Sequence, residues 1–308
     1  MTSGVTLAIP CRTDEPALGR TLEAAWRGLA EAGMPATTLV CLNGPNAEGS
    51  RAWRDLEAAA ARAGRRRVDE DADAPGPATT AAEGVRVVRT RRPGKAIAWN
   101  LLRKRLGTEV AVFLDADVEL GPDAIGRLVR ALVQAPDAIL ASPKTACAPR
   151  ATAFERVQAV PYGIDFPNLS GQLYAARTDG LPARMPEDLI EPERWLELAI
   201  GCDRMVRDPE ARVVVRLPAT LRDFYRQRIR LEMGKVQLAV DYPELARRGN
   251  AQPRLRTAVG RLSLPDLVRL GLYLALRESA HVVARRRFRR RPTAEVWVQA
   301  ASTKEWGA

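Results

Sequence analysis

The chain has 308 residues, with 48 lysines and arginines against 37 aspartates and glutamates, which gives a formal net charge of +11 at pH 7. A chain of this length can bury one substantial core plus an appendage, and its positive charge favours polyanionic partners such as nucleotide diphosphates, anionic lipid headgroups or nucleic acid. The single histidine excludes a histidine-based hydrolase triad and a histidine-rich zinc site. The four cysteines show neither metal-ligand spacing nor a dense disulfide framework.

The N-terminus carries no recognisable secretory signal, because an apolar strand pattern begins within its first residues. No stretch approaches the roughly 20 apolar residues that a membrane-spanning helix needs. The longest candidate covers residues 270–276. We therefore expect a cytoplasmic protein, and contact with the inner face of the cytoplasmic membrane stays open.

Strand and helix patterns alternate through the first third of the chain. Apolar runs predict strands at residues 5–9, 37–42, 85–88 and 110–114, and helical spacing lies between them, from Pro16 to Gly33, from Ser50 to Arg62 and from Gly94 to Leu106. This alternation predicts an α/β fold with a Rossmann-like, mostly parallel sheet flanked by helices.

Two carboxylates, Asp115 and Asp117, follow the apolar run that ends at Leu114. Such a run is typical of a strand buried on both faces, and acids after it would lie at the carboxyl edge of the sheet, where open α/β sheets bind ligands. A pair of hard oxygen ligands suits Mg²⁺ or Mn²⁺ held partly by substrate phosphates. From these residues alone, two solvated acids at a strand–turn junction remain an alternative.

Four motifs in a fixed order resemble family-2 glycosyltransferases of the GT-A fold. They are Val-Thr-Leu-Ala-Ile-Pro at 5–10, Val-Cys-Leu-Asn-Gly at 40–44, Gly-Lys-Ala-Ile-Ala-Trp-Asn at 94–100 and Phe-Leu-Asp-Ala-Asp at 113–117. The resemblance extends over about residues 4–235. It implies a GT-A-type sheet and a hexosyltransferase-like enzyme that moves a sugar from a nucleotide-sugar donor to an acceptor hydroxyl with inversion of the anomeric configuration.

In this family the first two strand ends hold the donor nucleotide, and the Asp-x-Asp motif holds a metal on its diphosphate. The resemblance thus implies Asp115 and Asp117 as metal ligands, with Mg²⁺ or Mn²⁺ as the cofactor. The implied donor-nucleotide residues are Pro10, Arg12, Asp14, Asn43, Lys95, Asn100 and Asp115. Many relatives carry an acid at the position of Asn43. Asparagine can accept the same hydrogen bond from uracil, but its amide can also donate, so uridine and guanine nucleotides both stay open.

The family's catalytic base follows the Asp-x-Asp motif by some tens of residues. The family commonly shows a pair of acids just before an aromatic and an aliphatic residue, and anchoring on Trp195 places Glu193 at the base. Pro192 then departs from the acidic neighbour that the family pattern expects. Glu191 is the second candidate for the base, and Asp188 is the third.

A Gly-rich acceptor loop normally precedes the base, and Gly171 matches it. Gln227 and Arg230 resemble the Gln-x-x-Arg-Trp signature of membrane-associated members, with Leu231 in place of the tryptophan. On a helix Gln227 and Arg230 share a face, and a guanidinium suits phosphate oxygens. The resemblance implies that Gly171, Gln227 and Arg230 contact the acceptor or a phosphate; a solvated basic helix face is the alternative for the last two.

We expect residues 1–235 to form the catalytic domain, with a mobile surface insertion at 64–84, and residues 236–308 to form a helical, basic C-terminal extension. Within the extension, a partly apolar helix pattern at 263–284 runs into an arginine-rich stretch at 285–291. Either this helix packs on the catalytic domain and the charges are solvated, or it lies in a membrane interface with its arginines on anionic headgroups. The second alternative would suit a lipid-linked acceptor.

The leading hypothesis is an inverting, metal-dependent glycosyltransferase with a nucleotide-sugar donor and a lipid-linked or saccharide acceptor. A nucleotidyltransferase of similar fold is one alternative, although residues 10–13 do not form the Gly-rich phosphate loop that it would need. A catalytically degenerate nucleotide-sugar-binding scaffold is another. Nucleic-acid binding is not expected, because no aromatic platform or zinc module accompanies the arginines.

Overall fold

The computed structural model describes residues 4–70, 84–148, 152–164, 168–248 and 262–290. The chain divides into two compact units, and the backbone passes between them several times. The first unit consists of Met1–Lys144, Leu169–Glu187 and Asp203–Val213, and the second of Thr145–Asn168, Asp188–Cys202 and Val214–Ala308.

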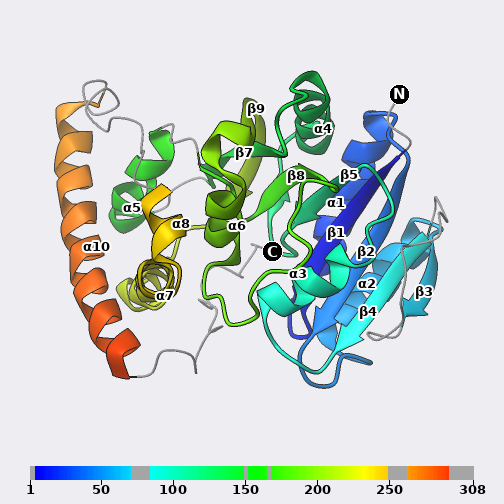
Figure 1. Ribbon diagram of the computed structural model, residues 1–308, viewed down its shortest axis with the longest axis horizontal. Helices are drawn as coiled ribbons and strands as arrows, with labels where there is room; N and C mark the ends of the chain where they lie inside the picture. The colour runs from blue at the N-terminus through cyan, green and yellow to red at the C-terminus, as the bar shows by residue number, and fades with distance from the viewer. Residues whose placement is uncertain (1–3, 71–83, 149–151, 165–167, 249–261, 291–308) are drawn as a thin grey trace. The chain divides into compact units, whose positions relative to one another are not determined.

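The described residues form a sheet of nine strands, which belongs mainly to the first unit (Figure 1). The strands are β1 (Val5–Arg12), β2 (Ala36–Asn43), β3 (Arg66–Glu70), β4 (Gly84–Thr90), β5 (Val110–Leu114), β6 (Glu119–Leu120), β7 (Leu140–Cys147), β8 (Leu173–Arg177) and β9 (Met205–Val215). Their order across the sheet is β3-β4-β2-β1-β5-β8-β7-β9-β6. Neighbours from β3 to β5 pair in parallel, whereas β8 is antiparallel to β5 and to β7.

Both faces of this sheet are buried by helices. The helices of the first unit are α1 (Leu18–Glu31), α2 (Arg51–Arg62), α3 (Lys95–Arg103) and α4 (Ala124–Gln134). In β2, Val40 and Leu42 belong to a core cluster with residues of α1, α2 and α4, while Leu39 and Cys41 point to the opposite face and are also fully buried. Burial on both faces explains the continuous apolar runs of the sequence. The predicted α/β fold, with a mostly parallel sheet flanked by helices, is confirmed.

Residues 66–70 form β3, although the sequence analysis placed them in a surface insertion. β3 pairs in parallel with β4 at the edge of the sheet. Its last residue, Glu70, ion-pairs with Arg86 and lies 3.0 Å from Nε of Arg105, whose side chain is 2% exposed. A charged edge strand lacks the apolar periodicity by which strands are recognised, and this explains the difference. Residues 71–83 of the expected insertion lie outside the described residues.

The second unit is helical where it is described. Its helices are α5 (Ala153–Gly163), α6 (Pro192–Ile200), α7 (Leu221–Asp241), α8 (Pro243–Arg248) and α10 (Leu264–Arg290), and a single 3₁₀ turn, η1 (Cys202–Arg204), precedes β9. The expected helical C-terminal region is confirmed. α7 runs through residue 235, so the domain boundary expected there falls inside a helix.

The long helix α10 packs along α7 and also contacts α5 (Figure 1). Phe224 of α7 and Tyr273 of α10 meet edge to face in a small apolar core. Arg228 of α7 donates a hydrogen bond of 2.6 Å to the Tyr273 hydroxyl and lies over its ring. The described part of the chain contains no helix whose length and apolar character would let it cross a bilayer. Residues 249–261 and 291–308, and with them Arg291, lie outside the described residues.

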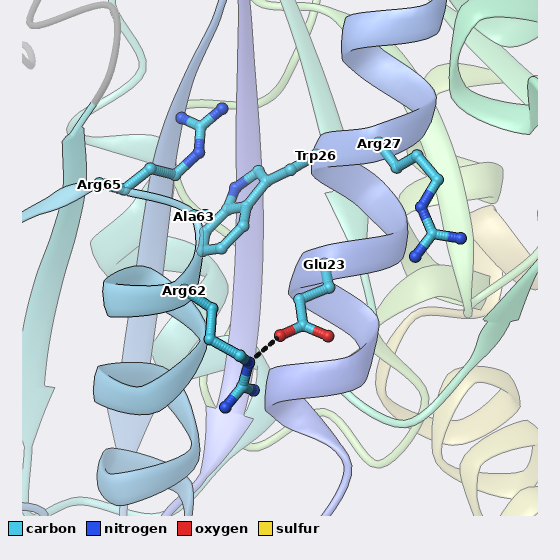
Figure 2. A pocket seen from close by; sticks show the side chains of 6 residues that line it. All are labelled: Glu23, Trp26, Arg27, Arg62, Ala63 and Arg65. Carbon is cyan, nitrogen blue, oxygen red and sulfur yellow. Dashed lines mark hydrogen bonds and ion pairs between the residues drawn. The ribbon is translucent and has the colours of Figure 1, made fainter.

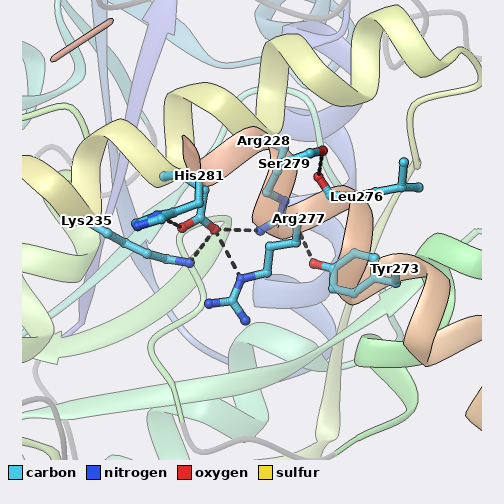
Figure 3. Close-up of polar contacts among 8 residues, drawn as sticks. Arg228, Lys235, Tyr273, Leu276, Arg277, Ser279 and His281 are labelled. Carbon is cyan, nitrogen blue, oxygen red and sulfur yellow. Dashed lines mark hydrogen bonds and ion pairs between the residues drawn. The ribbon is translucent and has the colours of Figure 1, made fainter. Parts of the chain in front are cut away.

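The buried carboxylate of Glu232 joins α7 to α10, and Figure 3 labels its partners Lys235, Arg277 and His281. Glu232, which is 1% exposed, accepts a hydrogen bond of 2.7 Å from Nζ of Lys235 and lies 3.4 Å from Nε of Arg277 and 3.2 Å from Nδ1 of His281. Burial acts to raise the pKa of Glu232, but Lys235, Arg277 and Arg228 act more strongly together and lower it. The carboxylate therefore stays charged and holds the two helices together.

Candidate functional site

Three strand ends lie in register at the carboxyl edge of the sheet. Arg12, the last residue of β1, is aligned with Asn43 at the end of β2, and Asn43 is aligned with Thr90 at the end of β4. Asp115 follows β5, which is the neighbour of β1 on its other side. This is the edge at which open α/β sheets bind ligands.

Asn43 braces two backbone segments at this edge. Its Nδ2 donates to the carbonyl oxygen of Cys11 at 2.9 Å, and its Oδ1 accepts from the N–H of Gly94 at 3.4 Å. Because a carbonyl only accepts and an N–H only donates, these two contacts fix the orientation of the amide. Through these two hydrogen bonds Asn43, which is 1% exposed, connects the end of β1 to the start of α3. Its contact with a nucleotide base stays a prediction.

Arg12 and Asp14 form a two-pronged ion pair directly after β1. Nε of Arg12 donates to Oδ1 of Asp14 at 2.8 Å, and a terminal guanidinium nitrogen donates to Oδ2 at 2.7 Å. The hydrogen bond with Asp14 raises the pKa of Arg12 above its usual value. The pairing of β1 with β5 ends at Ala8, two residues before Pro10, which has no N–H to give to a sheet.

Lys95 connects the Asp-x-Asp segment to the loop that contains Gly171. Its Nζ lies 2.6 Å from Oδ1 of Asp115 and donates to the carbonyl oxygen of Gly171 at 3.0 Å. Both charged side chains keep partial exposure. Lys95 therefore contacts Asp115, another predicted donor residue, and Gly171, which was predicted for the acceptor or a phosphate.

The backbone that carries the two acids is held from two sides. The N–H of Asp115 donates to the carbonyl oxygen of Gln172 at 2.8 Å, and the hydroxyl of Thr21 on α1 donates to the carbonyl oxygen of Ala116 at 2.9 Å. Ala116 is buried, whereas Asp115 and Asp117 on either side of it are partly exposed. The alternation directs the carboxylates away from the core.

Asp115 and Asp117 fit a divalent cation that shares its coordination with a diphosphate. Carboxylate oxygens are the hard ligands that Mg²⁺ and Mn²⁺ prefer. Within the described ranges, no group of three or more acidic, histidine or cysteine side chains could hold a metal ion. Substrate oxygens would therefore have to complete the coordination of a cation at this pair.

Asn100 uses both ends of its amide on the backbone of Met185. Its Nδ2 donates to the Met185 carbonyl oxygen at 2.9 Å, and its Oδ1 accepts from the Met185 N–H at 2.9 Å. Asn100 lies in α3 and is buried. The residue thus fixes a segment more than eighty residues further along the chain. Its expected contact with the donor nucleotide stays a prediction.

In the second unit, Glu191 and Glu193 flank Pro192 at the start of α6. Glu191 is the residue before the first helical turn, and its carbonyl oxygen accepts from the N–H of Trp195 at 3.2 Å. Proline is favoured at the first helical position because its fixed φ suits the helix and its missing N–H is not needed there. The start of the helix accounts for the proline that departs from the family pattern. Glu193 lies in the first turn, where the helix dipole favours a carboxylate.

The side chain of Glu191 lies against α7, where Gly234 leaves room for it. A Cβ added to Gly234 would stand 2.5 Å from Cγ of Glu191. Burial raises the pKa of Glu191 to about 7, against the opposing effect of Lys235 and Arg230. The residue as a whole still reaches solvent. A carboxyl group with a pKa near neutrality is suited to general acid–base chemistry.

Gln237 of α7 fixes the backbone just before Glu191. Its Nε2 donates to the carbonyl oxygen of Asp188 at 3.0 Å, and its Oε1 accepts from the N–H of Ile190 at 2.9 Å. Neither Gln237 nor Gly234 was predicted from the sequence as a site residue. A glycine inside a strong helical pattern was the only available signal, because such a glycine often has a packing reason.

Gln227 and Arg230 lie one turn apart on α7 and are both partly exposed. The positive charge of Arg230 acts on Glu191 and favours its ionised form. Arg230 and Glu191 therefore belong to one electrostatic neighbourhood. A contact of Gln227 or Arg230 with the acceptor stays a prediction.

A stack of three aromatic rings supports the first unit, and the sequence analysis did not anticipate it. The ring centroids of Trp99 and Phe113 are 5.6 Å apart, and those of Phe113 and Tyr174 are 5.0 Å apart. Nε1 of Trp99 also donates to the Tyr174 hydroxyl at 2.9 Å. The stack joins α3, β5 and β8, the elements that carry or adjoin Lys95, Asp115 and Gly171.

A surface hollow of about 480 Å³ lies elsewhere on the first unit (Figure 2). It is lined by residues of α1, α2 and the segment that follows α2, namely Glu23, Trp26, Arg27, Arg62, Ala63 and Arg65. Arg62 ion-pairs with Glu23 at 2.7 Å, and Arg65 lies over the Trp26 ring. None of the predicted site residues lines this hollow.

The parallel sheet, its flanking helices and the acids at a strand end define an α/β protein of the GT-A type. The structure of a mannosyltransferase from Pyrobaculum calidifontis in complex with GDP-Man and Mn²⁺ matches with a TM-score of 0.58 and 18% identity, over 94% of this chain and 88% of that chain. This likeness shows the fold. A structure of glucosyl-3-phosphoglycerate synthase from Mycobacterium tuberculosis in complex with UDP matches with a TM-score of 0.48 and 16% identity, over 77% of this chain and 79% of that chain. The comparison with curated proteins gives no match.

The model of the family described as glycosyl transferase family 2 matches residues 71–173. The matched range contains five of the predicted site residues, namely Lys95, Asn100, Asp115, Asp117 and Gly171. Over this range the match confirms the resemblance to family-2 glycosyltransferases found in the sequence.

Proposed function

We propose that the protein is an inverting, divalent-cation-dependent glycosyltransferase that moves a sugar from a nucleotide-sugar donor to an acceptor hydroxyl. The contact of Lys95 with both Asp115 and Gly171, at the carboxyl edge of the parallel sheet, is the observation that carries the proposal. The mannosyltransferase with the same fold holds GDP-Man and Mn²⁺, which supports a donor of this class. Guanine and uracil nucleotides both remain candidates for the donor.

On the donor side, the reaction breaks the bond between the anomeric carbon and a diphosphate oxygen. Negative charge grows on that oxygen while the sugar becomes oxocarbenium-like. A bound Mg²⁺ or Mn²⁺ supplies Lewis-acid stabilisation of this charge, and Asp115 and Asp117 would hold it. The ammonium of Lys95 adds a second positive charge beside Asp115. Thr21 fixes the backbone of the acids, so their carboxylates need little reorganisation when charge develops.

On the acceptor side, we propose Glu191 as the general base, in preference to Glu193, which the sequence analysis ranked first. A pKa of about 7 leaves a large share of Glu191 ionised at neutral pH, while keeping it basic enough to take a proton. The acceptor oxygen forms a bond to the anomeric carbon on the face opposite the leaving diphosphate, and its proton passes to the Glu191 carboxylate. This displacement inverts the anomeric centre. Glu193 and Asp188 are the alternatives that mutagenesis would test.

The charges near Glu191 bear on the class of acceptor. Arg230 places a guanidinium in the neighbourhood of the base, and Gln227 shares its helix face. A guanidinium binds phosphate oxygens in a two-pronged geometry, so an acceptor that carries a phosphate would be favoured. A saccharide acceptor and a lipid-linked acceptor both fall within the proposal, and the lipid-linked form would bring the enzyme to a membrane surface.

Thermal unfolding with nucleotide sugars tests the donor half of this function. We expect GDP-linked or UDP-linked sugars to raise the Tm when Mn²⁺ or Mg²⁺ is present and to do so much less in EDTA, because a ligand that binds only the folded state stabilises it. Asp117→Asn should abolish the metal-dependent shift. Asp137→Asn, at an exposed acid after α4, is the matched control and should keep it. The absence of a shift with every nucleotide sugar would count against the proposal.

Product analysis separates the proposal from its alternatives. A glycosyltransferase releases a nucleoside diphosphate when an acceptor is supplied. A nucleotidyltransferase would instead release pyrophosphate from a nucleoside triphosphate and a sugar phosphate. A binding scaffold would show the metal-dependent shift and no turnover with any acceptor.

A further inference from the structure

Helix α10, drawn in orange to red in Figure 1, has apolar side chains on two opposite sides. One side packs inside the second unit, and its buried residues are Leu270, Tyr273, Ala280, Ala284 and Phe288. The Glu232 cluster fixes the same side of the helix to α7 through Arg277 and His281. The orientation of α10 on its unit is therefore set by packing and by buried charge.

The opposite side of α10 presents a row of large apolar side chains to solvent. Leu264 is 76% exposed, Val268 68%, Leu272 51% and Val282 48%. At 3.6 residues per turn, these four positions fall within an arc of about 80° on the helix surface. Single exposed apolar residues are ordinary on proteins, but a row along one face indicates an interaction surface. We call this row the apolar stripe.

The apolar stripe continues into a positively charged end. The five exposed arginines of the last two turns are Arg285, Arg286, Arg287, Arg289 and Arg290. Helical periodicity places Arg286 and Arg289 close to the same arc as the stripe. One face of α10 thus combines apolar side chains with guanidinium groups that attract anions.

We propose that this face lies on the surface of an anionic lipid membrane, with the apolar stripe at the boundary between headgroups and acyl chains and the arginines on the headgroups. A bilayer with anionic lipids offers an apolar layer and negative charge side by side over a long flat area. The 27 residues of α10 make a helix of about 40 Å, which suits contact along the surface. The sequence allowed either a packed helix or an interfacial one; in this proposal α10 is both, through opposite sides.

The packing of α10 makes this a preformed surface. A free amphipathic segment loses conformational entropy when it orders on a membrane, whereas α10 is already ordered by α7 and α5. Its mode of binding also needs no membrane-spanning segment. The proposal does not depend on catalysis, so inactivity of the enzyme would leave it standing.

Flotation of the full-length protein with vesicles tests the proposal. We expect binding to phosphatidylcholine vesicles that contain phosphatidylglycerol, little binding to pure phosphatidylcholine, and release as salt rises, because headgroup attraction is screened within roughly 8–10 Å near physiological salt. Replacing three of the four stripe residues, Leu264, Val268 and Leu272, by Ser should lower the bound fraction at low salt by about tenfold or more. Replacing the five arginines by Gln should lower it at least as much and remove the dependence on anionic lipid.

Control variants test whether vesicle binding depends on this face of α10 or only on the net charge and exposed apolar residues of the protein as a whole. Five exposed arginines elsewhere, namely Arg20, Arg27, Arg51, Arg66 and Arg222, can be replaced by Gln with the same change in net charge. The exposed Leu221 and Val240 of α7 serve as apolar controls when replaced by Ser. Both control proteins should bind vesicles within about twofold of the wild type, and all variants should keep the wild-type Tm.

Two results would overturn the proposal. One is equal vesicle binding by the wild type, the stripe variant and the α10 arginine variant. The other is a molar mass above that of the monomer, measured by light scattering without lipid, for the wild type but not for the stripe variant. That second result would assign the face to contact with another copy of the chain.

Discussion

Cγ of Glu191 occupies the space that a side chain on Gly234 would need. A Cβ built on Gly234 stands 2.5 Å from this Cγ and 3.1 Å from Cδ, the carboxyl carbon. Glycine inside a helix costs roughly 0.5–1 kcal/mol relative to alanine, so its presence in α7 calls for a packing reason. The close approach buries the carboxyl group against the helix, and burial is the main cause that raises the pKa of Glu191 to about 7.

Gly234→Ala should therefore damage the base without unfolding the protein. The added methyl group must push Glu191 or α7 aside, which exposes the carboxyl group to water and moves its pKa back toward the ordinary value of 4.5. We expect kcat to fall by about tenfold or more, because a small displacement of a base disrupts the geometry of proton transfer. A pH–rate profile should show its acid limb shifted to lower pH.

Gly271→Ala on α10 is the matched control. A Cβ at Gly271 meets no atom within 4 Å. The substitution should stabilise the protein by about 0.5–1 kcal/mol through helix propensity and leave kcat unchanged. Equal kinetic effects at the two glycines would show that the contact between Glu191 and Gly234 has no role in turnover.

The raised pKa of Glu191 predicts the pH dependence of the reaction. A base must be ionised to accept a proton, so kcat should rise with pH, reach half its plateau near pH 7 and level off above it. Glu191→Gln should remove most of the activity at every pH, while Glu193→Gln should retain both the activity and the profile. The opposite pattern would return Glu193 to the role of base, and full activity of both variants would leave Asp188 as the next residue to test.

The same group predicts how stability responds to pH. The folded protein binds the Glu191 proton more tightly than the unfolded chain does, since the pKa is raised on folding. The contribution of Glu191 to stability therefore falls as pH rises from about 4.5 to about 7, and the loss is complete above that range. In denaturant titrations, the free energy of unfolding of Glu191→Gln minus that of the wild type should increase as pH rises across this window. A difference that does not vary with pH would contradict the raised pKa.

Removal of the metal should lower the activity as much as replacement of Asp117 does. EDTA should abolish turnover, and added Mn²⁺ or Mg²⁺ should restore it. Asp115→Ala and Asp117→Ala should each lose several kcal/mol of transition-state stabilisation in kcat/KM, since the diphosphate charge is no longer compensated. Asp115→Ala should also remove the carboxylate that lies 2.6 Å from the ammonium of Lys95 in the structure. Full activity of Asp117→Ala in EDTA would refute the metal-dependent mechanism.

The sequence was sufficient to predict the parallel strands β1, β2, β4 and β5 and the strand end that carries the paired acids. Strands buried on both faces leave continuous apolar runs, and the run that ends at Leu114 locates Asp115 at a strand end. Helix α3 was predicted from the segment that begins at Gly94 for the same kind of reason. Both predictions rest on local periodicity, which the chain carries within a few residues. The edge strand β3 has no such periodicity, because its residues are mostly charged.

Contacts between distant segments could not be predicted in this way. Asn43 and Asn100 match family motifs, but a motif does not say whether an amide contacts a ligand or a distant backbone segment. The ranking of Glu193 above Glu191 came from motif alignment alone. The feature that distinguishes Glu191 is its burial against Gly234, which lies more than forty residues away in the sequence. Desolvation depends on packing, and packing between segments this far apart leaves no local pattern.

Asn100→Ala tests whether Asn100 serves to fix the backbone of Met185 or to contact the donor nucleotide. The substitution leaves the N–H and the carbonyl oxygen of Met185 without their partners, at a cost of about 1–3 kcal/mol for each group that remains buried. We expect the free energy of unfolding to fall by about 2–4 kcal/mol in denaturant titrations. Gln227→Ala, at a partly exposed amide of α7, should change it by less than about 0.5 kcal/mol. At a temperature where the Asn100 variant is still folded, its metal-dependent affinity for the donor should stay near that of the wild type. Unchanged stability together with lost donor affinity would instead place Asn100 in contact with the nucleotide, as the family resemblance implied.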